Sequence, residues 1–353
     1  SKQFLYDYAS RDVKRDKSFN ISTITVGYGK RLKVPDDYFS LSNSVSFSYY
    51  DLNNYNTGLF TFGNGASRNL AFNTTLSRDS RGIDPVFPDH GSNFSISAKF
   101  TLPYSLFNGV DYKALQNEEK YKLKYTSTSG ITTQPNEENV SPVEGDYIVQ
   151  VGESSVYQKA DSYQTASLDR AKYDQERFKW LEFYKIKFSG DWYTKVYKKF
   201  VLRTRGEFGF LGAYNQDRGI VPFERFYVGG DGLANYSLDG REVIQLRGYP
   251  NNSLSSSNGG TIYNKYSMEL RYPITMKQTA KIYAMSFLEA GSAFDSFKKF
   301  DPFKMQRSAG FGLRVFMPAF GLLGIDFAHG FDPVPGATVK SGWQTHFIIG
   351  QQF

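Results

Sequence analysis

Long segments in which apolar and small polar residues alternate are the feature that most constrains how this chain folds. Across residues 41–50, LSNSVSFSYY, Leu41, Val45 and Phe47 share one phase, and positions 42 to 48 of the other phase are all serine. Residues 92–103, SNFSISAKFTLP, repeat the alternation. A period of two residues is that of a β-strand whose two faces meet different surroundings. The sequence therefore predicts an all-β fold with one apolar and one hydrophilic face on each strand.

The same alternation predicts about eleven strands, and most of them are long. A tilted strand needs about 9 to 11 residues to cross a bilayer, whereas strands of soluble proteins centre on about 5 or 6. The hydrophilic face carries Ser, Thr, Lys and Arg, as expected of a wet lumen and not of a packed core. A transmembrane antiparallel β-barrel is therefore favoured over the alternative, a soluble β-sandwich or propeller. The predicted strands lie near residues 20–31, 41–53, 69–79, 92–104, 181–195, 197–211, 261–274, 280–292, 306–317, 321–330 and 342–353.

Composition agrees with a barrel and argues against an enzyme. Aromatic residues make up 17% of the chain, although no run of some 18 apolar residues is present. Cysteine is absent, and the three histidines, at 90, 329 and 346, are scattered, so we expect neither a metal site nor a cysteine nucleophile. The net charge of +7 is distributed singly along strand positions, which is typical of a solvated lumen and not of a nucleic-acid surface. We expect no enzymatic activity and no cofactor.

Two long connections interrupt the pattern of strands and short turns. We predict a single domain, residues 1–353, with a long extracellular insertion at 106–178 and a second long loop at 215–260. The insertion is polar and rich in Glu, Lys, Ser and Thr. Short turns at one end and long loops at the other are typical of outer-membrane barrels.

Several stretches occur in the order of one family's motifs. Residues 75–100, TLSRDSRGIDPVFPDHGSNFSISAKF, fit a strand–turn–strand of the type R-D-x-x-x-P-x-F-P-x-x-G-S. Residues 222–233, PFERFYVGGDGL, contain F-Y-x-G-G, and residues 245–249, QLRGY, fall at the place of V-R-G-[FY]. The chain ends in HFIIGQQF at 346–353. Over most of residues 20–353 it resembles the barrel domain of the BamA family of outer-membrane assembly proteins.

The resemblance implies that the second long loop folds back into the lumen, where Arg247 meets acidic residues of the wall. By position its partners are Glu269 and Glu289, and the strand phase independently points both carboxylates inward. A guanidinium fork suits carboxylates, and the alternative is a solvated arginine on an outer loop. The family more often has Val at Leu246 and Asp at Glu289. The predicted luminal residues are Arg247, Gly248, Tyr249, Glu269 and Glu289, with a loop-entry motif of Phe226, Tyr227, Gly229 and Gly230.

The last strand carries a further signal. Phe347, Ile349 and Phe353 share the lipid-facing phase, and Gly350 lies among them. The resemblance implies that this strand pairs weakly with the first strand and forms a lateral gate for client strands. Such recognition would be β-augmentation, in which an exposed edge pairs with an incoming strand through main-chain hydrogen bonds. At Gly350 there is no side chain to pack across the gate.

The function implied by the resemblance is that of an outer-membrane protein insertase in a Gram-negative bacterium. Its partners would be nascent outer-membrane β-barrel proteins, accessory outer-membrane lipoproteins or surface-exposed subunits, and the lipid bilayer, with no nucleic acid. The alternatives are a polypeptide-secreting pore of the two-partner secretion type and a soluble or lipid-anchored binding domain. The family has sixteen strands and POTRA domains, so we expect this chain to be the C-terminal part of a longer polypeptide, because an open sheet leaves backbone groups unsatisfied in lipid.

Overall fold

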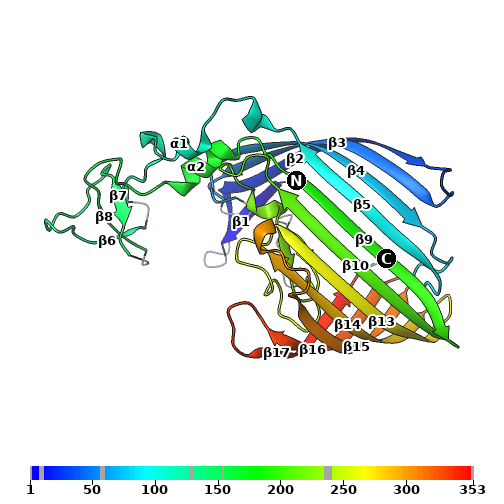
Figure 1. Ribbon diagram of the computed structural model, residues 1–353. Helices are drawn as coiled ribbons and strands as arrows, with labels where there is room; N and C mark the ends of the chain where they lie inside the picture. Colours follow the sequence, from blue (N-terminus) through cyan, green and yellow to red (C-terminus); the bar gives the residue numbers. More distant parts are fainter. Residues whose placement is uncertain are drawn as a thin grey trace.

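The computed structural model describes residues 2–7, 12–55, 60–127, 130–152, 155–233 and 241–350. One antiparallel sheet of twelve strands dominates the fold, and its strand order follows the sequence. The strands, drawn in Figure 1, are β1 (Lys2–Asp7), β2 (Asp12–Arg31), β3 (Phe39–Asn53), β4 (Gly65–Asp79), β5 (Gly91–Thr101), β9 (Tyr184–Tyr197), β10 (Phe200–Gly212), β13 (Ile262–Met276), β14 (Lys281–Phe294), β15 (Gln306–Met317), β16 (Gly321–Pro333) and β17 (Lys340–Ile349).

All eleven predicted strands are present in the large sheet, and one strand of that sheet, β1, was not predicted. β1 pairs with the first half of β2, from Lys2 opposite Asn20 to Asp7 opposite Asp12, with a bulge between Phe4 and Leu5. It was missed because it has only six residues, and its two end residues, Lys2 and Asp7, are charged, so alternation alone did not reveal it. The fold prediction of a large antiparallel barrel sheet is confirmed, with twelve strands in place of about eleven.

The register of the strands separates an apolar outer face from a polar inner face. Val26 lies opposite Val45, Val45 opposite Phe72, and Phe72 opposite Phe100. This row is exposed, with Val26 at 73% and Phe72 at 45% of full accessibility. Directly opposed residues share a face, so the ladder produces a continuous apolar surface. We call the other, concave side of the sheet the lumen.

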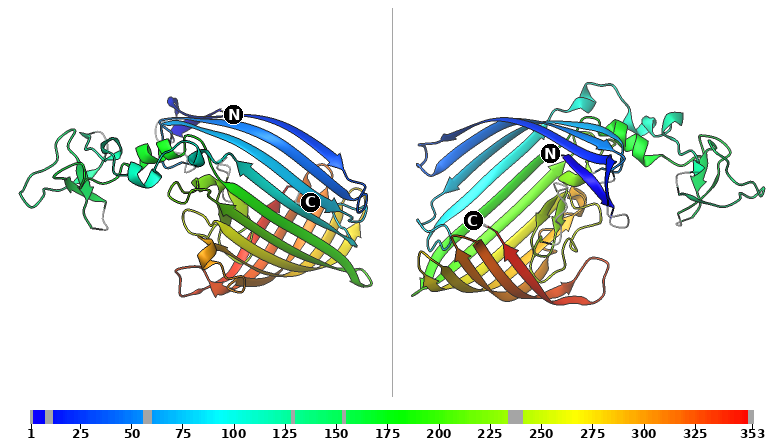
Figure 2. Two further views of the ribbon diagram at one scale, coloured as in Figure 1. Left: turned by 45° about the horizontal axis from the view of Figure 1, so that its top comes forward. Right: turned by 180° about the vertical axis from the view of Figure 1, so that it is seen from behind.

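The connection between β10 and β13, residues 213–261, lies on the concave side of the sheet, and we call it the luminal loop (Figure 2). It contains the short helix η4 (Pro222–Glu224) and two parallel strands, β11 (Phe226–Val228) and β12 (Glu242–Ile244). Loop residues pack against inward-facing residues of the sheet, and the main hydrophobic core therefore lies inside the lumen. Its largest fully buried members include Tyr249, Phe226, Leu246, Leu254 and Phe62.

The connection between β5 and β9, residues 102–183, projects away from the sheet and is longer than the predicted 106–178 (Figure 1). It has a small core of its own, formed by Tyr112, Leu115, Tyr121 and Tyr173. Among the described residues, no helix is long and apolar enough to cross a membrane. The elements of this excursion are η1 (Tyr104–Leu106), α1 (Tyr112–Leu115), η2 (Glu119–Tyr121), α2 (Arg170–Arg177) and a sheet of β6 (Thr132–Thr133), β8 (Val156–Lys159) and β7 (Ile148–Gln150).

Candidate functional site

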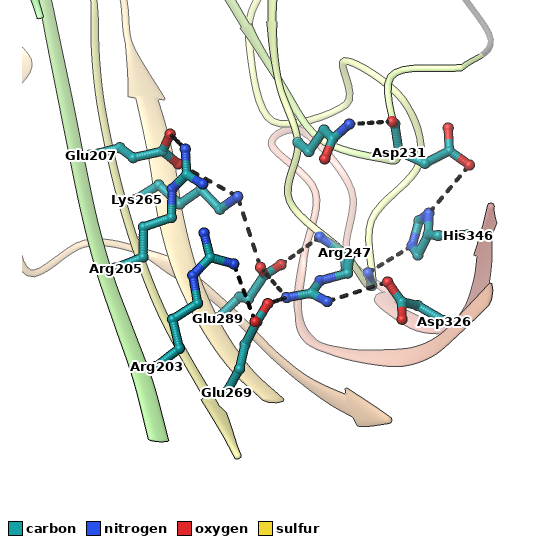
Figure 3. Close-up of polar contacts among 12 residues, drawn as sticks. Arg203, Arg205, Glu207, Asp231, Arg247, Lys265, Glu269, Glu289, Asp326 and His346 are labelled. Carbon is teal, nitrogen blue, oxygen red and sulfur yellow. Dashed lines mark hydrogen bonds and ion pairs between the residues drawn. The ribbon is translucent and has the colours of Figure 1, made fainter. Parts of the chain in front are cut away.

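The guanidinium of Arg247, at the tip of the luminal loop, lies among three carboxylates of the barrel wall (Figure 3). Nη2 is 2.8 Å from Oε1 of Glu269 on β13 and 2.7 Å from Oε1 of Glu289 on β14. Nη1 is 3.2 Å from Oδ2 of Asp326 on β16. Arg247 is 7% exposed, so these contacts replace its hydration. The contacts with Glu269 and Glu289 that the resemblance implied are present, and both carboxylates point inward as strand phase predicted.

Glu289 contacts Arg247 twice. Its Oε1 contacts the guanidinium, and its Oε2 accepts a hydrogen bond from the Arg247 backbone N–H at 2.9 Å. The Arg247 Cζ also lies 3.6 Å from the ring centroid of Phe287, within the range of a cation–π contact. The longer glutamate side chain thus reaches both the backbone and the side chain of the loop.

Each acidic partner of Arg247 also has a cation on the wall. Nη2 of Arg271 lies 2.5 Å from Glu269, and Arg314 holds both oxygens of Asp326 at 2.7 Å. Burial opposes the charge of Arg247, but Glu289 and Glu269 outweigh it and raise the pKa of Arg247 above its ordinary value. The site is therefore a network of paired buried charges in which Arg247 stays protonated.

Gly248 places the loop backbone directly against the wall. Its N–H donates to Nε2 of His346 at 2.8 Å, and its carbonyl accepts from Oγ of Ser341 at 2.7 Å. Its φ is +86°, and a Cβ added there would lie 2.8 Å from Cβ of Ser308 and 3.1 Å from the backbone N of Gly330. Only glycine suits both this backbone conformation and this close approach.

Tyr249 is the third residue of the RGY motif, residues 247–249, and it is held against the wall. It is fully buried, and its hydroxyl donates to the backbone carbonyl of Arg307 at 2.7 Å. Gly330 on β16 leaves room for it, because a Cβ there would lie 3.2 Å from the Tyr249 ring and 2.4 Å from the Gly248 carbonyl oxygen. Arg247, Gly248 and Tyr249 together contact β13, β14, β15, β16 and β17.

The loop-entry motif is buried and is hydrogen-bonded to the residue that precedes the RGY motif. Phe226 and Tyr227 are buried, at 0% and 3% exposure. Gly230 and Leu246 exchange two backbone hydrogen bonds, at 3.0 and 3.1 Å, so the entry to the loop is tied to the residue before Arg247. The Gly229 N–H donates to the carbonyl of Ile244 at 3.0 Å in the same ladder.

A second group of ion pairs, which the sequence did not predict, holds the other end of the luminal loop. Glu224 meets Nζ of Lys99 at 2.6 Å, and Glu242 meets Lys185 at 2.7 Å and Lys187 at 2.9 Å. Burial raises the pKa of both loop glutamates, but the lysines outweigh it and hold each pKa below its ordinary range. The loop is thus bound to β5 and β9 through its acidic residues and to β13–β16 through Arg247.

Asp231 of the loop reaches the last strand. Its Oδ2 accepts the backbone N–H of Phe347 at 3.2 Å and lies 3.8 Å from Nδ1 of His346. Burial raises the pKa of Asp231, but the backbone N–H groups of Leu233 and Phe347 outweigh it and lower that pKa. The loop therefore contacts β17 at two successive residues.

The terminal-strand residues lie partly as the sequence suggested. Phe347 and Ile349 are exposed on the apolar face, at 53% and 61%. The Gly350 N–H donates to the carbonyl of Leu322 at 3.0 Å, and Phe353 lies outside the described residues. β1 and β17 are the two edges of the sheet, and no ladder joins them within the part of the chain that the structure describes. The lateral gate thus stays a prediction.

Asp326 is the functional residue that sequence reasoning missed on the wall. Leu323, Ile325 and Phe327 occupy the opposite phase of β16, so the period-2 pattern already places Asp326 inward. Within the described ranges, no group of three or more His, Cys, Asp or Glu residues is arranged to hold a metal ion.

Comparisons with known proteins give one consistent relationship. Residues 142–353 match the Omp85 superfamily domain. Over 118 residues, 33% of this chain and 14% of the relative, the sequence is 32% identical to the outer membrane protein assembly factor BamA of Neisseria meningitidis serogroup B. The chain therefore spans about a seventh of that relative's length.

One solved structure shares the fold. BamA from Haemophilus ducreyi lacking POTRA domains 1–3 superposes with a TM-score of 0.53 at 14% identity, covering 94% of this chain and 54% of that chain. CdiB from Escherichia coli superposes with a TM-score of 0.46 at 10% identity, covering 94% of this chain and 45% of that chain.

Replacing Arg247 by Ala is expected to release the luminal loop. The change leaves buried carboxylates short of one cation, which costs about 3–5 kcal/mol of unfolding free energy. Arg247→Lys keeps the charge but loses the guanidinium fork, so its unfolding free energy should lie between those of Arg247→Ala and the unsubstituted protein. Urea unfolding and limited proteolysis of the loop measure the effect.

The control is Arg307→Ala, which breaks an exposed pair with Asp332 at 2.9 Å and should change stability little. If Arg247→Ala has the same urea midpoint and the same protease resistance of the loop as the unsubstituted protein, Arg247 does not hold the loop.

Gly248→Ala is expected to be more damaging than Gly336→Ala. Both glycines have nearly the same backbone conformation, with φ of +86° and +85°, but a Cβ at Gly336 meets nothing within 4 Å. The shared conformational cost is about 1–2 kcal/mol, and the contact with Ser308 adds to it only at Gly248. Equal urea midpoints for the two variants would show that the close approach of the loop to the wall is not stabilising.

Proposed function

The chain belongs to the Omp85 superfamily, and we propose that it is the C-terminal barrel part of an insertase that folds client β-barrel proteins into the outer membrane. The superfamily match and the β-barrel neighbours make it an integral protein of the Gram-negative outer membrane. The observation that carries the proposal is the contact of the RGY motif with five consecutive strands ending at the edge strand β17.

The sequence relative supports assembly over secretion. The matched BamA protein is described as an outer membrane protein assembly factor. A polypeptide-secreting pore of the same superfamily is the alternative, and it is distinguished by the experiment below. On the proposed function no cofactor and no covalent catalysis take part, because strand pairing itself supplies the driving interaction.

The edge of β17 supplies the hydrogen-bonding groups for a client strand. Because the Gly350 N–H bonds the carbonyl of Leu322, even-numbered residues of β17 pair with β16. The N–H and C=O groups of Phe347 and Ile349 therefore point to the opposite edge. In this proposal a client strand pairs at that edge, while the lipid-facing side chains of the two residues continue the apolar surface.

The carboxylate of Asp231 binds one of these edge groups, the N–H of Phe347. Since its carboxylate accepts the Phe347 N–H, the luminal loop holds a group that an incoming strand would use. We infer that loop position and strand pairing compete at Phe347. The excursion of residues 102–183, with its own core, is the proposed contact for an accessory subunit.

Site-specific crosslinking tests the insertase proposal. The chain contains no cysteine, so Ile349→Cys in the intact protein should crosslink to a cysteine in the terminal strand of a client barrel during assembly. Leu288→Cys is the matched control, because Leu288 is 56% exposed on the same face but lies on β14, which is paired on both sides.

Equal crosslinking at the two positions would indicate collision on the lipid face and not pairing at the edge. Crosslinks of an exported polypeptide to the lumen, with none from Ile349→Cys to a barrel client, would identify a secretion pore.

Asp231→Ala should free the edge of β17 without unfolding the sheet. Loss of a hydrogen bond worth about 1 kcal/mol should speed amide exchange of Phe347 about fivefold. Hydrogen–deuterium exchange of a peptide containing residues 342–350 measures it. Asp217→Ala, an exposed aspartate of the same loop, is the control, and unchanged exchange in Asp231→Ala would refute the competition at Phe347.

A further inference from the structure

The connection between β14 and β15, residues 295–305, folds outward over the lipid-facing side of the sheet, and we call it the rim loop. Along β13, Ile262 and Asn264 share the outward phase of Tyr266 and Met268. Yet the first two are 0% and 1% exposed, whereas the last two are 49% and 47% exposed. The Asn264 Nδ2 donates to the carbonyl of Pro302 at 3.3 Å, which identifies the rim loop as the cover.

Phenylalanines attach the rim loop to this outer face. Phe300 lies 5.9 Å from Phe208 and 5.2 Å from Phe294, measured between ring centroids, and Phe297 lies 6.0 Å from Phe210. Phe208, Phe210 and Phe294 occupy outward positions of β10 and β14. The aromatic cluster is therefore continuous with the lipid-facing surface of the sheet.

Two aromatic side chains of the rim loop remain open to the surroundings after this packing. Phe297 is 68% exposed and Phe303 is 89% exposed. The loop lies at the same end of the sheet as the long connections 102–183 and 213–261, the outer end of a barrel of this type. Girdles of aromatic residues lie at the membrane interfaces of outer-membrane barrels, so we expect these phenylalanines at the boundary between acyl chains and head groups.

Three lysines accompany the exposed phenylalanines. Lys298, Lys299 and Lys304 are exposed, and Lys299 has only a 3.9 Å contact with Asp295. Among the described residues, neither Lys298 nor Lys304 forms an ion pair. The second acid of the loop, Asp301, accepts the backbone N–H of Phe303 at 3.0 Å. The loop therefore carries one more positive than negative charge, and its ammonium groups lack close carboxylate partners.

We propose that the rim loop is a binding site for a phosphorylated lipid of the outer leaflet, the phosphoglycolipid lipid A. Its acyl chains would lie against Phe297 and Phe303, and its phosphates would meet Lys298, Lys299 and Lys304. Lysine stems extend along apolar surface while their ammonium groups stay at the level of the head groups. Basic residues at this level attract anionic lipids. This inference does not depend on the proposed insertase function.

Native mass spectrometry of the intact protein in detergent micelles with diphosphoryl lipid A tests the site. The combined variant Lys298→Gln, Lys299→Gln and Lys304→Gln should bind lipid A at least about tenfold more weakly. Phe303→Ser should also weaken binding, because it removes an exposed apolar contact without disturbing the phenylalanine cluster. Heat-modifiable migration in gels verifies that each variant is folded.

The charge-matched control replaces three exposed lysines of the excursion, Lys113, Lys120 and Lys172, by Gln. It changes the net charge equally and should bind lipid A as the unsubstituted protein does. The proposal is overturned if the control weakens binding as much as the rim-loop variant, or if the rim-loop variant binds normally. It is also overturned if dephosphorylated lipid A binds equally well.

Discussion

The buried guanidinium of Arg247 is the interaction on which the arrangement of loop and barrel wall depends. A charge that leaves water must meet carboxylates of good geometry, or its burial is strongly unfavourable. Glu269, Glu289 and Asp326 converge on it from three strands, and each also forms an ion pair with a cation of the wall. Apolar packing is non-directional, whereas these ion pairs and hydrogen bonds require one position of Arg247 relative to the wall. The charge network therefore specifies where the loop lies, and the apolar core stabilises that choice.

Part of this site follows from the sequence, because strand phase is a local property. Alternation predicted the eleven long strands and turned Glu269 and Glu289 toward the lumen. The same rule applied to β16 turns Asp326 inward, so its place on the inner wall also follows from the sequence. β1 is different, because six residues with a charged residue at each end carry too short a pattern to be recognised.

The remaining contacts depend on the path of the luminal loop, which no local pattern encodes. Glu224 meets Lys99, 125 residues away, and Asp231 meets Phe347, 116 residues away. Nothing in the spacing of these residues predicts their pairing, since the loop carries several acidic residues and the wall several lysines. The ion pairs of Glu224 and Glu242 attach the loop to β5 and β9, at a place separate from the contacts of Arg247.

Asp231 joins this path to the edge of the sheet and makes loop and edge interdependent. Gly248 donates to His346, and the next residue, Phe347, donates to Asp231, so the loop holds two successive residues of β17. Coupling between binding events is reciprocal in free energy. On the proposed function, the contact of Asp231 with Phe347 makes strand pairing less favourable by a certain free energy. A strand that displaces Asp231 then makes the attachment of the loop less favourable by the same free energy. Arg247 would then limit the movement, because its carboxylates lie on β13, β14 and β16 and none on β17.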